Sequence, residues 1–404
     1  TFSYLPLTII QIYRVFVEYG QEAIRLPKTG SFFIFGARGT GKTTLLKFLF
    51  PEAIYINLLR SKDEEALSKN PASLRDIVYG NVNKKIIIDE IQKIPKLLDE
   101  VHDLIEEGYD RFILTGSSAR KLKRGSANLL AGRAVYRALF PFTSFELKEN
   151  FHLESALALG TLPKLFSLQE QESKIDYLQS YIRTYLREEI QIEQVVRKLE
   201  PFRSFLEVAA QMNGKILNFS KIERDVGASV KTIQNYYQIL IDTHLGFFVN
   251  GFHESWRKQL SQAPKFYFFD TGVCRALARR IQIPVTSSTY EYGDLFEQFI
   301  IGECHKMNEY LNREYSFTYL RTKDDAEIDL IIDRPGKSRV LVEIKSKSSI
   351  QKEDLAHIIT FKSEHPEVEA YCLSQDPHLK KIEGVRCTPW QQGLEEILFF
   401  KGAL

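Results

Sequence analysis

The stretch that decides the fold is Gly36-Ala-Arg-Gly-Thr-Gly-Lys-Thr43, which follows the apolar run Ser31–Phe35 and leads into the segment TTLLKFLF. It matches the pattern G-x4-G-K-[ST] of a phosphate-binding loop, between a predicted strand and a predicted helix. Glycines let backbone N–H groups close around phosphate oxygens, and the start of the helix adds its positive end. The sequence therefore predicts a nucleotide-phosphate site here.

The pattern also assigns roles to side chains within this loop. Lys42 is expected to reach the β- and γ-phosphates, and the Thr43 hydroxyl is expected to ligate Mg²⁺. The residues expected to contact ATP are Gly36, Arg38, Gly39, Thr40, Gly41, Lys42, Thr43 and Thr44. The competing interpretation is a glycine-rich turn that matches the pattern by chance.

A second motif, Ile86-Ile-Ile-Asp89-Glu90, ends a run of β-branched residues in two carboxylates. Such a run predicts a buried central strand, and ligands bind at the carboxyl ends of the strands in sheets of this kind. Asp89 is expected to hold Mg²⁺, and Glu90 is expected to polarise the attacking water. The alternative is an acidic start to a helix.

Hydroxyl side chains follow the next strand-like segment, RFILTGS. Thr115, Ser117 and Ser118 are placed there to sense the γ-phosphate or the water, with Ser117 as the catalytic candidate. Serine and threonine are also common at helix starts, so capping is the competing interpretation.

The pattern of strands and helices predicts an α/β protein. Apolar strands alternate with amphipathic helices up to about residue 140, which indicates a parallel sheet covered on both faces. The predicted division is a P-loop core with an N-terminal amphipathic helix at 1–145, a helical lid at 146–200, a winged helix-turn-helix at 201–285 and a C-terminal α/β domain at 286–404. A length of 404 residues fits several domains.

With these motifs in place, the chain resembles the AAA+ ATPases, specifically the AAA_14/DUF4143 group. The resemblance rests on GARGTGKT, IIIDEIQKIP, LTGSSARKL, LAGRA and LFPFTSFE, and later on KFYFFDTGV, DLFEQFIIGE and AEIDLII. In such proteins an arginine from a neighbouring subunit often completes the ATP site. The resemblance points to Arg133 for this role, with Arg120 as the second candidate. It implies a homo-oligomer, with a hexameric ring as one form.

The 201–285 segment has the outline of a DNA-binding module. A helix, a short helix, a glycine turn, a longer helix and two β-rich stretches form the pattern of a winged helix-turn-helix. The segment contains eleven Lys/Arg against six Asp/Glu. The residues expected to contact DNA are Lys221, Arg224, Lys231, Gln234 and Asn235, while Arg257 and Lys258 fall in the expected wing. A protein-protein platform is the alternative.

Three separated acids and one lysine form a second constellation near the C-terminus. Asp329 lies in the strand-like AEIDLII, and Glu343 and Lys345 lie two apart in RVLVEIK, so they face the same side. This arrangement resembles the PD-(D/E)XK nuclease core, in which one metal is held while the lysine orients water. Glu297, on a predicted helix, is expected to complete the metal shell. The alternative is a nuclease-derived domain that grips DNA or mediates assembly.

The bulk composition leaves the partner open. The formal net charge is +2, so local charge decides whether nucleic acid binds. Four cysteines lie far apart without a CxxC pair, which argues against a zinc site and fits a reducing, cytoplasmic compartment. The opening 24 residues lack both an unbroken apolar run of about 18 residues and the basic start of a signal peptide. Neither a signal peptide nor a membrane partner is therefore expected.

Together these features predict an ATP-hydrolysing motor that acts on duplex or branched DNA, in a task such as junction remodelling or translocation. Two other functions remain open from the sequence. One is an ATP-regulated, metal-dependent DNA nuclease. The other is a slow nucleotide switch that binds a protein partner through the winged helix.

Overall fold

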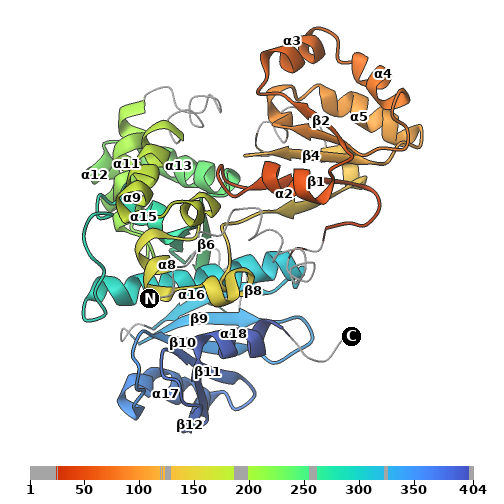
Figure 1. The fold of residues 1–404 in the computed structure, drawn as a ribbon. Coiled ribbons are helices and arrows are strands. Elements are labelled where there is room, and N and C mark those ends of the chain that lie inside the picture. The colour runs from red at the N-terminus through yellow and green to blue at the C-terminus, as the bar shows by residue number, and fades with distance from the viewer. Residues whose placement is uncertain are drawn as a thin grey trace. The chain divides into compact units, whose positions relative to one another are not determined.

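The computed structural model describes residues 24, 26–118, 120, 122, 129–185, 199–253, 262–322 and 326–399 (Figure 1). The predicted N-terminal helix and the expected wing residues Arg257 and Lys258 lie outside these residues. The chain divides into two compact units. Unit 1 comprises Thr1–Glu149, Thr161–Arg197 and Tyr237–Leu245, and unit 2 comprises Asn150–Gly160, Lys198–Tyr236 and Gly246–Leu404.

Unit 1 is built on a five-stranded sheet in the order β2-β3-β4-β1-β5. Its strands are β1 (Ser31–Phe35), β2 (Ile54–Asn57), β3 (Ile86–Asp89), β4 (Phe112–Gly116) and β5 (Ala134–Ala138). Every neighbouring pair is parallel. Strands β1, β3 and β4 are buried along their whole length, as expected for a sheet covered on both faces. The predicted parallel α/β sheet is confirmed.

Helices connect the strands of unit 1 and bury their apolar sides against the sheet. Leu97, Val101 and Leu104 of α5, spaced for one helix face, join the core beneath β3 and β4. The helical elements of this unit are α2 (Lys42–Leu49), α3 (Ser61–Lys69), α4 (Ser73–Tyr79), η2 (Ile91–Lys93), α5 (Leu97–Glu106), η3 (Leu129–Gly132), α7 (Ser144–Leu147), η5 (Pro163–Ser167), α9 (Gln171–Ser180) and the π-helix η6 (Tyr181–Tyr185), with η4 (Lys148–Asn150) at its boundary.

Unit 2 is built on an eight-stranded mixed sheet in the order β12-β13-β11-β10-β9-β8-β6-β7. The antiparallel hairpin β6–β7 joins the other strands because β6 pairs in parallel with β8. The strands are β6 (Gly246–Gly251), β7 (Lys265–Phe268), β8 (Ser316–Arg321), β9 (Glu327–Asp333), β10 (Val340–Lys345), β11 (Glu369–Ser374), β12 (Lys380–Ile382) and β13 (Val385–Pro389).

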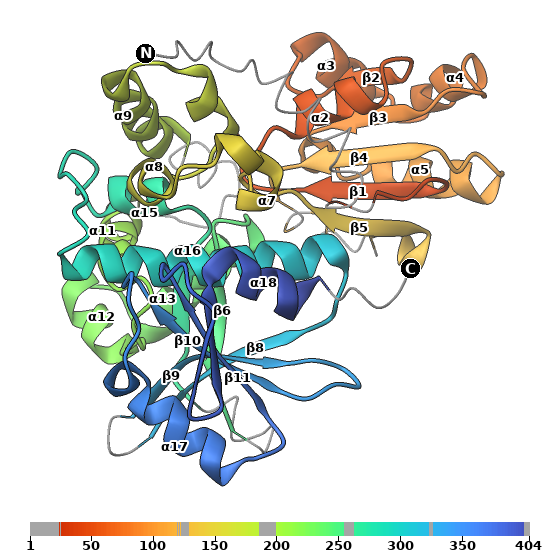
Figure 2. The same cartoon turned by 60° about the horizontal axis from the view of Figure 1, so that its bottom comes forward.

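The helices of unit 2 include α16, the long helix that lies beside α18 over the sheet (Figure 2). Phe299 of α16 meets Trp390 of α18 edge-on, with ring centroids 5.6 Å apart. The helical elements are α8 (Leu153–Leu159), α11 (Leu199–Gln211), α12 (Phe219–Val226), α13 (Val230–Asp242), α15 (Thr271–Leu277), α16 (Tyr290–Leu311), η7 (Lys352–Leu355), α17 (Ala356–Glu364) and α18 (Trp390–Leu398). The last turns of α13 belong to unit 1.

The two compact units cut the chain differently from the four predicted segments. Within unit 2, strands from the predicted winged helix at 201–285 and from the predicted domain at 286–404 share one sheet. In unit 1, residues of the predicted lid belong with the P-loop core. The four-segment division therefore stays a prediction.

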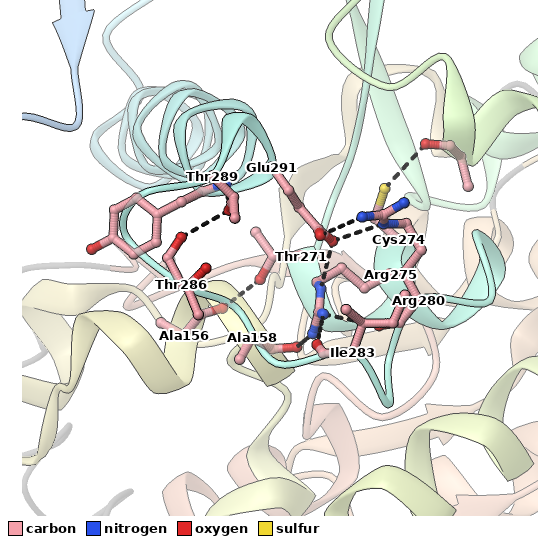
Figure 3. Close-up of polar contacts among 12 residues, drawn as sticks. Ala156, Ala158, Thr271, Cys274, Arg275, Arg280, Ile283, Thr286, Thr289 and Glu291 are labelled. Atoms are coloured by element: carbon pink, nitrogen blue, oxygen red, sulfur yellow. Dashed lines mark hydrogen bonds and ion pairs between the residues drawn. The ribbon is translucent and has the colours of Figure 1, made fainter.

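A buried arginine ties several segments of unit 2 together (Figure 3). Arg275 of α15 is 3% exposed and donates to the carbonyl oxygens of Ala158 at 2.7 Å and Arg280 at 2.9 Å, and also to that of Ile283. Its Nε lies 3.2 Å from a carboxylate oxygen of Glu291 at the start of α16. One side chain thus satisfies buried acceptors from α8, from the turn after α15 and from α16.

Candidate active site

The phosphate-binding loop has the backbone conformation that its glycines permit. Gly39 and Gly41 have φ of 81° and 90°, values that favour glycine because it lacks a Cβ. Gly41 is the residue that precedes α2, so the loop ends at a helix N-terminus. Lys42 is buried and its Nζ donates to the carbonyl oxygens of Gly36 at 2.7 Å and Ala37 at 3.1 Å. The ammonium group is therefore held within the loop itself.

The two predicted Mg²⁺ ligands lie side by side. Thr43 Oγ1 donates to Asp89 Oδ2 at 3.0 Å, although the residues are 46 positions apart. The hydroxyl of Tyr55 on β2 also donates to Asp89 Oδ2. Burial and this hydrogen bond raise the pKa of Tyr55, so the phenol stays protonated and acts as a donor. Sequence reasoning missed Tyr55, because its link to Asp89 exists only once β2 and β3 pair.

Glu90 follows β3 in an unusual backbone conformation. Its φ of 62° is rare for a residue with a side chain. The Gln92 amide Nε2 donates to Glu90 Oε2 and, at 3.1 Å, to Ser117 Oγ. Glu90 and the predicted sensor Ser117 are therefore joined by one buried side chain. The sequence signal for Gln92 was only its place two residues after the acid pair, and it was not singled out.

The other predicted loop residues divide into buried and exposed positions. Thr40 is buried and its Oγ1 donates to the Ala37 carbonyl at 2.8 Å, which shapes the loop, while Arg38 is exposed and Thr44 is half-buried. Thr115 and Ser118 are fully buried, and Ser118 Oγ accepts from the Arg120 backbone N–H at 3.1 Å. The sheet thus brings the predicted residues of both motifs to one edge.

Comparison with known families agrees with this geometry. Residues 28–148 match the family described as an AAA domain, and this span contains the phosphate loop, Asp89, Glu90 and Ser117. The chain carries an AAA-type ATPase domain. Residues 150–283 and 292–392 match two domains of unknown function, DUF8612 and DUF4143 respectively.

Among individual proteins, the ATPase is similar to the uncharacterised protein MJ1637 of Methanocaldococcus jannaschii. The two are 24% identical over 390 residues, which cover 82% of this chain and 79% of the relative. Among solved structures it is similar to a Walker-type ATPase of Pyrococcus abyssi, with a TM-score of 0.43 and 14% identity over 67% of this chain and 95% of the other. The Aeropyrum pernix Orc1 protein in complex with DNA gives a TM-score of 0.30 and 12% identity, over 68% and 93%. At TM-scores this low, neither structure bears on what this ATPase binds.

Both candidate trans arginines make ion pairs within their own unit. Arg133, after η3, pairs with Glu106 of α5 and its side chain is 37% exposed. Arg120 is buried, and its Nε lies 3.6 Å from Asp242 Oδ2. Arg133 is thus the more accessible of the two. Its ion pair with Glu106 would have to break before the side chain could reach the ATP site of a neighbouring subunit. Its role in trans stays a prediction.

The segment predicted as a lid contacts the phosphate loop within unit 1. The Tyr181 hydroxyl, in the π-helix η6, donates to the Arg38 carbonyl at 2.9 Å. A Cβ at Gly39 would lie 3.2 Å from the Tyr177 hydroxyl of α9. These two tyrosines therefore link the conformation of the loop to the helices that follow the sheet.

The predicted DNA-contact residues occupy solvent-facing positions of α12 and α13. Lys221, Arg224, Lys231, Gln234 and Asn235 are all exposed. The opposite sides of these helices bury Ile222, Ile233 and Tyr236. Within the described residues, the three cationic side chains form no ion pair.

The C-terminal acids lie near one another. Glu343 is buried, and its Oε1 accepts from Lys345 Nζ at 2.6 Å, which agrees with the prediction that they share a face. Asp329 Oδ2 accepts from the Ile344 N–H at 2.7 Å. Burial, together with the charges of Glu343 and Glu297, raises the pKa of Asp329 well above its ordinary value. The carboxylates are therefore close enough to destabilise each other's charge.

Protein groups contact several of these carboxylates. Among the described residues, no three His, Cys, Asp or Glu side chains are grouped so that they could hold a metal ion. Glu297 instead accepts from the Tyr267 hydroxyl at 2.6 Å, and the buried Lys265 lies 3.4 Å from Glu297 and 2.6 Å from Glu327. Lys265 and Tyr267 thus contact Glu297, and Lys345 contacts Glu343. The proposed metal shell of Glu297, Asp329 and Glu343 stays a prediction.

Within the described part of the chain, no helix is both long enough and apolar enough to span a membrane.

Proposed function

We propose that this ATPase is a cytoplasmic motor that acts on duplex or branched DNA, in junction remodelling or translocation. The observation that carries the DNA part is the surface of α12 and α13. Three cations and two amide side chains of these helices are exposed, while the apolar sides of the same helices are buried. Lysine and arginine on such a surface suit phosphate contact, and the absence of arginine from α13 favours contact with the backbone over reading of bases.

The chemistry of the motor resides in unit 1. Thr43 and Asp89 would hold Mg²⁺, which neutralises charge on the phosphates, and the 3.0 Å contact between their side chains supports this assignment. Lys42 binds the β- and γ-phosphates, Glu90 takes the proton of the attacking water, and Ser117 senses the γ-phosphate. If Arg133 acts in trans, the working form is a homo-oligomer such as a hexameric ring.

Replacing Lys221, Arg224 and Lys231 together with alanine tests the DNA surface. Each lost phosphate contact makes the negative slope of log K against log salt shallower by about 1. The slope of the triple variant should therefore be shallower than wild type by up to about 3. Fluorescence anisotropy with labelled duplex and four-way-junction DNA, from low to moderate salt, measures this slope. The charge-matched control replaces the exposed Lys62, Lys69 and Lys93 of unit 1. A triple variant with wild-type slope and affinity would remove α12 and α13 from the DNA surface.

A second candidate function is an ATP-regulated, metal-dependent DNA nuclease. In unit 2 Asp329 lies on β9, and Glu343 and Lys345 lie on the neighbouring strand β10. Glu343 Oε2 is buried with no hydrogen-bond partner among the described residues, as expected of an oxygen that binds a cation. Cleavage lost in Lys345→Ala or Asp329→Ala would support this function. No cleavage of varied DNA structures with Mg²⁺ or Mn²⁺ would exclude it.

Metal binding at this second site has a readout that does not depend on cleavage. A ligand that binds only the folded state stabilises it, so Mn²⁺ should raise the thermal midpoint of an Asp89→Asn variant, whose nucleotide metal site is removed. The rise should disappear when Asp329→Asn is added. Differential scanning fluorimetry with and without 1 mM Mn²⁺, about 1,000 times a Kd of about 1 μM, measures the shift. Equal shifts in both variants would place the bound metal elsewhere.

A nucleotide switch that binds a protein partner through the same helices is the remaining alternative. It predicts DNA affinity that does not respond to salt or to Lys231 and Arg224. The anisotropy experiment above therefore separates it from the motor.

A further inference from the structure

Gln92 occupies a buried position between the two residues expected to act on the attacking water. It lies in η2, directly after Glu90, and is 4% exposed. Its amide nitrogen donates to Glu90 Oε2 and to Ser117 Oγ. An amide NH₂ carries two hydrogens, so it can satisfy both acceptors at once. The end of β3 and the end of β4 are thereby joined through one side chain.

The residue beneath this amide is a glycine. A Cβ at Gly116 would lie 2.0 Å from Gln92 Oε1 and 2.9 Å from its Cδ, far inside van der Waals contact. Any larger residue at 116 must therefore push the Gln92 amide aside. The fold thus holds space at the end of β4 for this amide and for its contact with Ser117.

Two buried polar atoms next to this link have no hydrogen-bond partner among the described residues. They are Gln92 Oε1 and Thr115 Oγ1. Leaving a buried acceptor or hydroxyl unsatisfied costs about 1–3 kcal/mol, so such atoms are uncommon outside functional sites. Thr115 lies beside Asp89 in the register of β3 and β4. The unsatisfied atoms therefore lie around the residues of the hydrolytic step.

We propose that Gln92 is a positioning residue for ATP hydrolysis, which fixes the Glu90 carboxylate and couples it to Ser117. Glu90 leaves β3 with a left-handed backbone, which by itself does not fix the direction of the side chain. The Gln92 amide supplies the missing restraint and points one carboxylate oxygen toward the end of β4. When Ser117 shifts in response to the γ-phosphate, the same amide transmits that shift to Glu90.

The proposal predicts a loss in kcat with little change in ATP binding. Gln92 contacts neither the phosphate loop nor Asp89 in the described hydrogen bonds, so nucleotide affinity should stay near wild type. A misplaced catalytic group can cost up to about 100-fold in rate, and we expect a fall in kcat of about 10–100-fold for Gln92→Ala. Gln92→Glu keeps the size of the side chain but removes the donor and adds a charge beside Glu90, so it should be at least as impaired.

The test combines three variants with a neighbouring control. Steady-state ATPase kinetics give kcat and KM, a fluorescent ATP analogue gives the Kd, and thermal unfolding verifies folding. Lys93→Ala, an exposed change in the same short helix, should retain wild-type kcat. Gly116→Ala retains glutamine at position 92 but displaces its amide group. This variant should therefore lower kcat as Gln92→Ala does. In the double variant the two losses should not add, because both remove the same link.

Three results would overturn the proposal. The first is wild-type kcat in folded Gln92→Ala and Gln92→Glu. The second is a raised kcat in Gln92→Ala, which would mean that the amide restrains Glu90 from reacting. The third is a loss that lies in the Kd for ATP with kcat unchanged, which would assign Gln92 to nucleotide binding.

Discussion

Glu90→Gln is expected to lower kcat for ATP hydrolysis by about 10²–10⁴-fold, while ATP still binds. The change removes the carboxylate that takes the proton from water and retains the volume of the side chain. Lys42, Thr43 and Asp89, which hold the phosphates and Mg²⁺, are untouched. Steady-state phosphate release measures kcat, and titration with a fluorescent ATP analogue measures the Kd.

Asp89→Asn separates the two acids of the motif. It removes the carboxylate that Thr43 and Tyr55 contact, so it should weaken Mg²⁺-dependent ATP binding as well as turnover.

A Glu90→Gln variant that hydrolyses ATP at the wild-type rate would show that Glu90 is not the base. The assignment of roles within the motif would then have to be reversed or abandoned.

Arg275→Ala is expected to destabilise unit 2 by about 3–5 kcal/mol. The guanidinium group is 3% exposed, so its loss strands the Glu291 carboxylate and the carbonyl oxygens of Ala158, Arg280 and Ile283 without their donor. Trp390, one of the two tryptophans in the sequence, lies in α18 of unit 2. Urea unfolding followed by tryptophan fluorescence therefore reports on this unit.

Arg280→Ala is the matched control, because Arg280 pairs with the same Glu291 from a side chain that is 49% exposed. Exposed ion pairs contribute between 0 and about 1 kcal/mol, so this variant should remain close to wild type. Equal losses in the two variants would mean that the stability comes from the charge on Glu291 and not from the buried hydrogen bonds of Arg275.

Local motifs made the ATP site predictable from the sequence. The phosphate loop is a contiguous pattern of glycines, Lys42 and Thr43. In the Ile86–Glu90 segment, the apolar residues predict the strand and the two acids that follow predict the site. A strand that ends in a functional residue also fixes the edge of the sheet at which that residue lies. The parallel sheet followed from the same apolar runs.

The supporting residues were not predictable in the same way. Tyr55 meets Asp89 only through the pairing of β2 with β3, and Tyr181 meets Arg38 across 143 positions of chain. An isolated tyrosine carries no sequence signal for such a contact. Gln92 was within reach of the motif, but its second partner, Ser117, is supplied by β4.

The C-terminal site shows the limit of spacing arguments most clearly. Spacing placed Glu343 and Lys345 on one face, and their 2.6 Å contact agrees. It could not show that Lys265, from a hairpin assigned to another domain, would lie between Glu297 and Glu327. A strand added to the sheet from a distant segment brought this cation to the acids.

DNA dependence of the ATPase is the central claim, and steady-state ATP hydrolysis with Mg²⁺ tests it most directly. The rate is compared without DNA and with single-stranded, duplex and four-way-junction DNA, with Lys42→Ala as the blank. We predict marked stimulation by duplex or junction DNA that falls in the Lys221, Arg224 and Lys231 triple variant. Hydrolysis at one rate with every form of DNA would contradict the motor and favour the switch that binds a protein partner.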